Sequence, residues 1–149
     1  MKNHIFSGSL IISILIMILT SCKEKPDGIW PKMQWKYENI SDGISVDEKE
    51  YTIFITKEGS LDLVCKNYKY MWFSSIEPDY PEFFPNEENN NHFKNNWCSL
   101  TINSQTIHCE FFNLNSEGDN ELTVFVLAGD IGSRFRFIRM VEQIFNSES

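Results

Sequence analysis

Three cysteines and two histidines are the residues of the central and C-terminal chain that could carry covalent chemistry. Cys65, Cys98 and Cys109 would act as nucleophiles only beside a base, and the bases there are His92 and His108. His108 directly precedes Cys109, so on a strand their side chains point to opposite faces and cannot form a pair. The spacing gives no support to a pairing of Cys65 or Cys98 with His92. We therefore expect no catalytic cysteine.

A run of oxygen-bearing side chains later in the sequence resembles the start of a calcium-binding loop. Asn113, Asn115 and Glu117 alternate before Gly118, as the first ligands of such a loop do. The twelfth position is Val124, however, where a glutamate would have to complete the ligand set. A solvated turn between strands, rich in turn-forming residues, is the favoured interpretation.

Other signatures of catalysis and of nucleic-acid binding are missing from the sequence. It contains no serine nucleophile elbow, Cys-x-x-Cys, His-Glu-x-x-His, phosphate-binding loop or Rossmann glycine pattern. The 13 basic and 21 acidic residues give a net charge of −8, without the lysine and arginine clusters that attract nucleic acid. The sequence thus predicts a protein that is not an enzyme, holds no cofactor or metal, and binds no nucleic acid. A hydrolase is a weaker alternative, with carboxylates that are adjacent on a polar loop but not placed around a cleft: Asp79, Glu82, Glu87 and Glu88.

The N-terminus has the features of a bacterial lipoprotein signal peptide. Lys2 precedes an apolar run over residues 10–19, which is too short to span the roughly 30 Å hydrocarbon layer comfortably. Residues 19–22 (LTSC) resemble the lipobox, in which the cysteine is diacylated and becomes the new N-terminus. We expect residues 1–21 to be removed and Cys22 to be lipidated. The alternative is a short anchor helix with an incidental cysteine.

Lipid on Cys22 would attach the protein to a membrane without any contact from the folded domain, because two or three acyl chains give stable anchoring. Lys23 follows where inner-membrane retention would require Asp, so the outer membrane is favoured. Residues 23–25 (KEK) partly resemble the export tag of Bacteroidetes surface lipoproteins, which favours the cell surface. Residues 22–29 then form a tether, and residues 30–149 form the folded domain.

The rest of the chain alternates with the period of β-strands. About eight short strands, separated by turn signals, indicate an all-β, antiparallel, immunoglobulin-like sandwich. A hairpin is expected around residues 57–60, with Gly59 at a position of positive φ. Residues 68–76 are apolar on both sides and are expected to form a central strand, whereas residues 141–145 fit either a strand or a helical turn. The predicted strands cover residues 33–37, 51–56, 61–65, 68–76, 97–102, 106–112, 121–127 and 134–140.

A two-residue loop at residues 103–104 would pair Leu100 with Ile107 and Cys98 with Cys109. Export permits a disulfide, so Cys98 and Cys109 could form one. Their hydrogen-bonded position puts the Cα atoms near the outer part of the useful range. The alternative is that all three cysteines, including Cys65, are buried thiols that pack as small apolar groups.

Several segments together resemble a known family. They are residues 30–36 (WPKMQWK), residues 63–68 (LVCKNY) followed by Trp72 and Phe73, and residues 128–131 (AGDI) with 135–137 (FRF). These look like the small immunoglobulin-like lipoproteins of Bacteroides, which are similar to the Bacteroidetes-associated carbohydrate-binding often N-terminal (BACON) domain. The resemblance spans most of residues 30–140 and implies the sandwich fold more than a function. Unlike a typical BACON arrangement, this chain carries no attached glycosidase.

The connection over residues 77–96 is long for a compact domain, which is typical of functional or disordered loops. Tyr80, Phe83 and Phe84 could stack on sugar rings, while Asn89 and Asn90 could bond hydroxyl groups. These five residues form the predicted glycan site. The alternative is that the phenylalanines, with Phe93, fold back over a sheet edge.

We therefore expect an outer-membrane lipoprotein that acts as a non-catalytic binding module, with a glycan as its ligand. The alternative function is that of a structural subunit, in which an exposed strand edge pairs with another envelope protein.

Overall fold

Strands make up all the regular secondary structure in the computed structural model, which describes residues 30–78 and 91–140. They belong to one compact unit that begins at Lys32, while Met1–Pro31 is a separate unit. Within the described ranges, no helix has the length and hydropathy needed to cross a membrane. The strands are β1 (Trp35–Glu38), β2 (Ile44–Asp47), β3 (Thr52–Ile55), β4 (Gly59–Cys65), β5 (Trp72–Glu77), β6 (His92–Lys94), β7 (Cys98–Asn103), β8 (Thr106–Phe111), β9 (Glu121–Ala128) and β10 (Ile131–Arg139).

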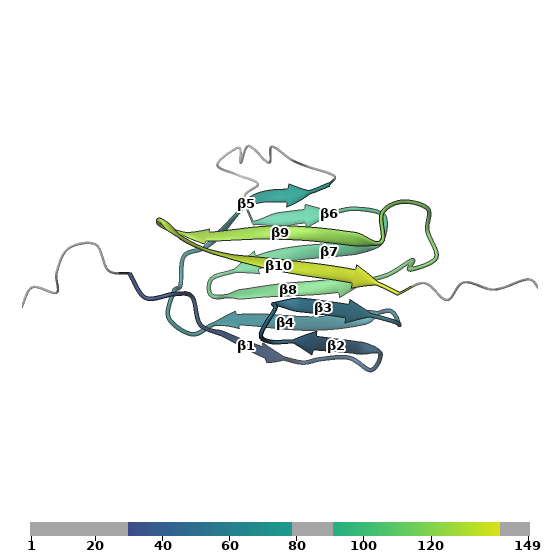
Figure 1. Cartoon of the computed structure of the whole chain (residues 1–149), viewed down its shortest axis with the longest axis horizontal. Helices are drawn as coiled ribbons and strands as arrows, with labels where there is room; N and C mark the ends of the chain where they lie inside the picture. The colour runs from purple at the N-terminus through teal and green to yellow at the C-terminus, as the bar shows by residue number, and fades with distance from the viewer. Residues whose placement is uncertain (1–29, 79–90, 141–149) are drawn as a thin grey trace, which may run out of the picture. The chain divides into compact units, whose positions relative to one another are not determined.

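The strands form two five-stranded sheets packed as a sandwich (Figure 1). Sheet A has the order β1-β4-β8-β7-β6 and is antiparallel throughout. Sheet B has the order β2-β3-β10-β9-β5, in which β3 runs parallel to β10. The prediction of an all-β sandwich is confirmed. The orders β1-β4-β8-β7 and β10-β9-β5 are consistent with the A-B-E-D and G-F-C sheets of an immunoglobulin fold.

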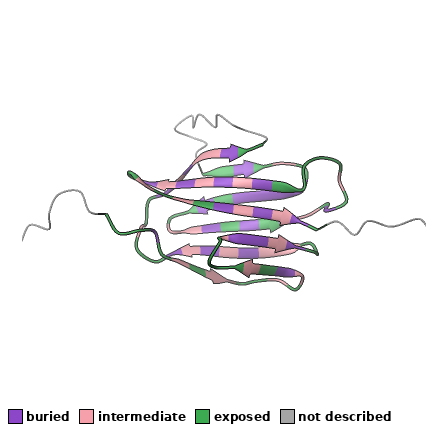
Figure 2. Ribbon diagram, viewed as in Figure 1, coloured by how far each residue is buried: buried purple, intermediate pink, exposed green. Residues whose placement is uncertain are grey.

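The core lies between the sheets and is built from alternate residues of each strand (Figure 2). Leu61, Leu63 and Cys65 of β4 all face inward, as the period of two predicts. On β10 the inward residues Phe135 and Phe137 are buried, and the ring of Trp35 meets that of Phe135 edge to face at 4.8 Å. The inward apolar residues of these strands therefore hold them in the sandwich by packing in the core.

The predicted number of strands is too low, because β2 and β6 were not expected. Both strands are short, with four and three residues, and both are flanked by polar turns. Phe93 is the inward residue of β6 and is buried in the core. One buried side chain in a three-residue strand leaves no periodic signal, so β6 could not be distinguished from the surrounding polar loop.

The predicted hairpin around residues 57–60 is wrong. β3 pairs with β2 and β10 in sheet B, whereas β4 pairs with β1 and β8 in sheet A. Residues 56–58 therefore cross from one sheet to the other. Gly59 is not a positive-φ residue; a Cβ atom there would lie 2.5 Å from the Ser41 Cβ atom. Because Gly59 has no side chain, the 39–43 loop can approach β4 closely. Ser41 Oγ of this loop accepts a hydrogen bond from Ser60 N.

The predicted register of β7 and β8 is also wrong, by two residues. The turn consists of Ser104 and Gln105, so Leu100 lies opposite Cys109 and Cys98 lies opposite Phe111. Ser104 takes the positive φ of 57° that the tight turn requires. Cys98 and Cys109 are thus diagonal neighbours on the inner face, and both are buried thiols, as is Cys65.

The prediction of a central strand over residues 68–76 is wrong as well. β5 begins at Trp72 and lies at the edge of sheet B, paired with β9 alone. Residues 66–71 instead cross from sheet A to sheet B, with Met71 buried and Tyr70 exposed. The run of aromatic residues reflects this crossing and not burial on two faces. The expected final hairpin is confirmed as β9 and β10, while residues 141–145 lie outside the described residues.

Candidate functional site

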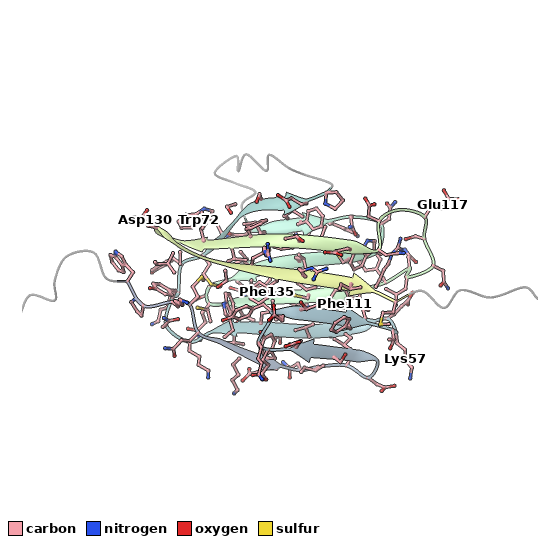
Figure 3. The ribbon with its side chains drawn as sticks, viewed as in Figure 1. Lys57, Trp72, Phe111, Glu117, Asp130 and Phe135 are labelled. Atoms are coloured by element: carbon pink, nitrogen blue, oxygen red, sulfur yellow. The ribbon has the colours of Figure 1, made fainter. Side chains whose placement is uncertain are left out.

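An open groove lies at the end of the sandwich where β6 and β8 finish. It has a volume of about 870 Å³ and is lined by Glu58, by residues 94–96 and by residues from 110 to 116. A second hollow of about 640 Å³ shares residues 94–96 and continues to residues 117–119. We call the two hollows together the end groove. Figure 3 shows Glu117 at this end and Asp130 at the opposite end.

The lining of the end groove combines amides, carboxylates, one lysine and one aromatic ring. Lys94 Nζ lies 5.4 Å from the centroid of the half-buried Phe112 ring. Asn95 Oδ1 accepts hydrogen bonds from the backbone nitrogens of Trp97 and Cys98, which leaves Asn96 as the exposed amide beside it. Lys94 is outnumbered by the lining carboxylates of Glu58, Glu110, Glu117 and Asp119, so the groove is acidic.

The buried side chain of Arg139 holds the 112–120 loop in place. Its guanidinium donates hydrogen bonds to Leu114 O at 3.0 Å, Ser116 Oγ at 2.9 Å and Gly118 O at 2.8 Å. Its Nε donates to Asn120 Oδ1 at 2.9 Å. Arg139 is 2% exposed, and within the described ranges no carboxylate forms an ion pair with it. Carbonyl and hydroxyl oxygens therefore compensate a buried positive charge.

These four acceptors come from every second residue of the loop, and they alternate with Asn113, Asn115 and Glu117, the residues of the calcium-like pattern. Residues 114, 116, 118 and 120 turn oxygen atoms inward, and the cation they surround is the guanidinium of Arg139. Gly118 has φ of 122°, a conformation that favours glycine at this turn. The Trp97 ring closes the site, with its centroid 5.5 Å from Arg139 Cζ. The favoured interpretation of this loop as a turn fits the structure.

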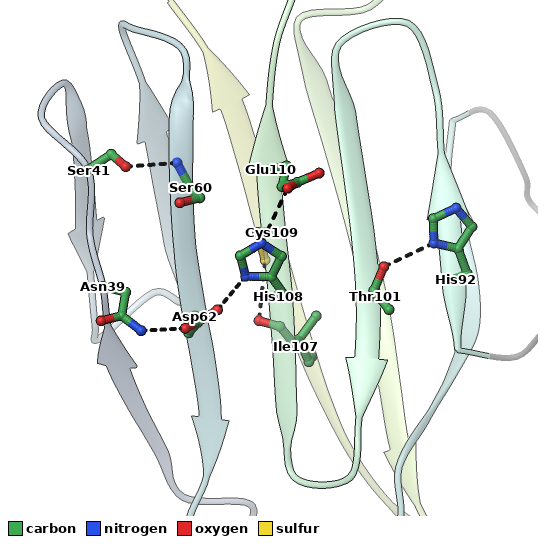
Figure 4. A network of polar contacts seen from close by, with 10 residues as sticks. All are labelled: Asn39, Ser41, Ser60, Asp62, His92, Thr101, Ile107, His108, Cys109 and Glu110. Carbon is green, nitrogen blue, oxygen red and sulfur yellow. Dashed lines mark hydrogen bonds and ion pairs between the residues drawn. The ribbon is translucent and has the colours of Figure 1, made fainter.

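A row of polar side chains crosses the outer face of sheet A (Figure 4). Asp62, His108, Thr101 and His92 lie opposite one another on β4, β8, β7 and β6. His108 Nδ1 lies 2.6 Å from Asp62 Oδ1, and His92 Nδ1 lies 3.0 Å from Thr101 Oγ1. Glu110, which lines the groove, lies 3.5 Å from His108 Nε2. The groove and this face therefore form one continuous polar surface.

The charges of this row stabilise one another. The hydrogen bond to Asp62 raises the pKa of His108, against the smaller opposing effect of burial, and Glu110 adds to the rise. For Asp62, burial favours the neutral acid, but the hydrogen bonds from His108 and Asn39 outweigh it and lower the pKa. Asn39 Nδ2 donates to Asp62 Oδ2 at 2.6 Å. The carboxylate is thus held in its charged form by two donors.

The thiols face the core and not this surface. Complete burial raises the pKa of Cys109 well above its usual value, so its sulfur is a neutral thiol. The side chain of His108 is on the opposite face of the same strand, as the sequence predicts. Within the part of the chain that the structure describes, no three His, Cys, Asp or Glu side chains are placed to hold a metal ion.

The predicted glycan-binding residues Tyr80, Phe83, Phe84, Asn89 and Asn90 lie outside the described residues, as does Cys22. Pro78, the last described residue before that segment, lines a hollow of about 340 Å³ with Asp119 and Asn120. β5 therefore ends, at Glu77 and Pro78, at the same end of the sandwich as the end groove.

Several residues of the site were not identified from the sequence. Phe112 falls within a predicted strand and Asn96 within the predicted 77–96 loop, while Arg139 falls within the predicted 134–140 strand with no role assigned to it. One signal was available for Arg139. It has the same parity as Phe135 and Phe137, so a strictly alternating strand would bury it.

Comparison with known proteins supports the fold. No protein-family model matches the chain, and no curated protein matches it. Among solved structures, it is similar to one described as the NMR structure of the protein from Bacteroides thetaiotaomicron. That likeness has a TM-score of 0.58 and 24% sequence identity, and it covers 79% of this chain and 94% of the other. Since identity is this low, the likeness shows the sandwich fold and no more.

Proposed function

We propose that the protein is a lipid-anchored, outer-membrane binding module that binds a glycan without catalysis. The observation that carries the proposal is the end groove, where amide, carboxylate and aromatic side chains surround an open space. Amides and carboxylates bond sugar hydroxyl groups, and an aromatic ring packs on the apolar face of a pyranose. Asn96, Glu110 and Phe112 supply these groups in the groove. Tyr80, Phe83 and Phe84 would add further rings from the segment that begins after Pro78.

The position of the groove also suits a tethered receptor. The chain enters the sandwich through Lys32 and β1, at the end opposite the groove (Figure 1). A lipid on Cys22 would therefore hold the entry end near the membrane and leave the groove open to solutes. The buried Arg139 fixes the groove loop in advance, which reduces the entropy lost when a ligand binds.

Glycan-array binding of the full lipoprotein, with matched variants, tests the ligand and its site. Asn96→Ala with Phe112→Ala should abolish binding, and Phe83→Ala with Phe84→Ala should weaken it. Tyr70→Ala changes an exposed ring at the opposite end and should leave binding intact. Thermal unfolding of each variant shows whether the domain is still folded. Binding that survives both double substitutions would contradict the site, and no binding to any glycan would contradict the ligand class.

Anchoring is tested separately by metabolic labelling with palmitate. The wild-type chain should incorporate the label and fractionate with the outer membrane, whereas Cys22→Ala should do neither. Protease treatment of intact cells then tests exposure at the surface. A wild-type chain that takes up no palmitate would contradict the anchoring proposal.

A protein partner is the second candidate function, and the outer face of sheet B favours it. Phe54 lies opposite Ile138, and Trp72 lies opposite Leu127; all four are half-buried apolar residues on the solvent side. A photo-crosslinking residue in place of Phe125, on the same face, should then capture one dominant envelope protein in cells. The same residue in place of Thr101, on sheet A, is the control. Equal capture from both faces would contradict this candidate.

A further inference from the structure

The 66–71 loop combines positive charge with an exposed aromatic ring at the end of the sandwich where the chain enters. Tyr70 is 86% exposed, and Lys66 and Lys69 are both exposed beside it. No acidic residue occurs between residues 66 and 71. Tyrosine and lysine together suit the boundary between lipid and water, since each has an apolar body and a polar tip.

The loop is fastened directly to the segment that leads to the expected lipid anchor. Gln34 N donates to Asn67 Oδ1 at 2.9 Å, and Asn67 Nδ2 donates to Lys32 O at 2.9 Å. Lys66 N also donates to Gln34 O at 2.8 Å. From Cys22 to Lys32 the chain has ten residues, which can extend no further than about 35 Å. A lipid on Cys22 would therefore keep Lys32, and the loop bonded to it, within about 35 Å of the bilayer.

The fold also holds the loop in an outward position. Met71 is buried at one end of the loop, and Cys65 is buried at the other, so the residues between them have fixed supports. The half-buried Tyr68 packs against the core, which leaves Tyr70 on the solvent side. Such a loop loses little conformational entropy when it meets a surface.

Charge is distributed unevenly between the two ends of the sandwich. The end groove has four lining carboxylates and one lysine, and the ion pair of Lys57 with Asp42 at the same end adds no net charge. The entry end has a comparable number of cations and acids. Its cations are Lys32, Lys49, Lys66, Lys69 and Arg134, and its acids are Asp47, Glu48, Glu50 and Asp130. An anionic surface would therefore repel the groove end more strongly than the entry end.

We propose that the 66–71 loop docks on the membrane surface, with Lys66 and Lys69 on anionic headgroups and Tyr70 at headgroup level. This inference rests on the proposed lipid anchor but not on the identity of the groove's ligand. Docking would orient the domain so that the end groove points away from the bilayer. The binding site would then be presented outward by the protein surface itself, in addition to the tether.

The test uses the full lipoprotein in phosphatidylcholine vesicles that contain phosphatidylglycerol. An environment-sensitive fluorophore is attached through Tyr70→Cys, and the matched control carries it through Lys57→Cys at the groove end (Figure 3). The native Cys65, Cys98 and Cys109 are fully buried and should not react. Spin-labelled lipid should quench the fluorophore at position 70 and not the one at position 57.

The lysines are tested with a third sample, the Tyr70→Cys reporter combined with Lys66→Gln and Lys69→Gln. Since each lysine near an anionic surface contributes a factor of about five, this change should lower the ratio of docked to free domain about thirtyfold. The Tyr70→Cys reporter with both lysines intact should show a similar fall in this ratio on vesicles of phosphatidylcholine alone. Unchanged quenching in both samples would overturn the assignment of the lysines.

Flotation of the same vesicles separates the two proposals. A wild-type chain that floats, while Cys22→Ala does not, supports the anchor. If the chain floats but positions 70 and 57 are quenched equally, the docking inference is overturned and the anchor stands. If the wild-type chain does not float, the anchor itself is contradicted, and docking with it.

Discussion

Replacement of Arg139 by methionine tests whether one buried cation holds the end groove together. The change removes the four hydrogen bonds to the 112–120 loop and the contact with Trp97, while it keeps an unbranched apolar side chain of similar length. We expect the loop to lose its fixed conformation and the folded state to lose stability. Ligand binding in the groove should fall for the same reason.

The size of the effect follows from two opposing contributions. Hydrogen bonds from a charged donor stabilise by about 1.5–3 kcal/mol each, so the four bonds together contribute at least about 6 kcal/mol before other costs. Return of the guanidinium to water in the unfolded state offsets several kcal/mol of this. Three acceptors lie on residues with access to water and can be hydrated, whereas Leu114 O stays buried. A net loss of about 3 kcal/mol results, or about 10 °C in Tm.

Urea unfolding followed by tryptophan fluorescence measures the loss in the free energy of unfolding. Hydrogen exchange shows whether protection is lost in the 112–120 loop. Arg136→Met is the matched control, because Arg136 lies on the same strand but is exposed and pairs with Glu121 at 2.8 Å. Arg136→Met should lower the free energy of unfolding by no more than about 0.5 kcal/mol, as expected for an exposed ion pair. Arg139→Lys should resemble Arg139→Met, since one ammonium cannot reach the same spread of acceptors. An Arg139→Met protein as stable as the wild type, with a protected loop, would refute this reasoning.

Three further predictions concern single groups of the described domain. The Oη atom of Tyr37 is buried without a hydrogen-bond partner among the described residues, and burial, with the nearby Tyr51, raises its pKa to about 12. Tyr37→Phe should therefore leave stability unchanged or raise it by up to about 1 kcal/mol in urea unfolding, and a clear loss would be unexpected. The stabilising contribution of His108, whose pKa is raised, is complete below its ordinary value of 6.5 and is lost as the pH rises through its folded value. The contribution of Asp62, whose pKa is lowered, is complete above its ordinary value of 3.8 and is lost as the pH falls through its folded value. The difference in stability between the wild type and His108→Gln should thus be larger at about pH 5 than at pH 9, and equal differences would contradict the ion pair. Because Cys98 and Cys109 are diagonal and not directly opposed, the intact mass of the protein should be the same with and without reduction; a difference would show that a disulfide forms.

The sandwich could be predicted because most of its strands obey a strict alternation. β4, β9 and β10 bury every second residue, and that pattern is visible without knowledge of their partners. Which strands pair is a different matter, because pairing depends on contacts that are distant in sequence. The crossing at residues 56–58 and the hairpin predicted there have the same turn-forming residues, and only the packing of Gly59 against Ser41 distinguishes them. The register error had a similar cause, since Asn103 and Ser104 form as plausible a turn as Ser104 and Gln105.

The candidate site was harder to predict because its residues come from separate connections. Asn96 and Phe112 follow different strands, and they meet only because β6, β7 and β8 are neighbours in sheet A. The row from Asp62 to His92 depends on the register of four strands, so an error of two residues in one hairpin is enough to hide it. The sequence did exclude a dyad of His108 and Cys109, because that argument needs alternation alone.

Arg139 connects the regular part of the fold to the irregular part. Its backbone ends β10, where Arg139 N donates to Asn120 O, and its side chain then takes the inward place that alternation assigns to it. An apolar residue at this position would complete the core but would leave the carbonyl groups of Leu114 and Gly118 without their donors. A loop on the surface of a sandwich normally satisfies such groups with water and stays mobile. Here the core itself supplies the donors, and among the loop side chains only Ser116 and Asn120 accept hydrogen bonds from Arg139. The side chains of Asn115 and Glu117 accept none of these hydrogen bonds, so substitutions at these two positions should retain the shape of the end groove.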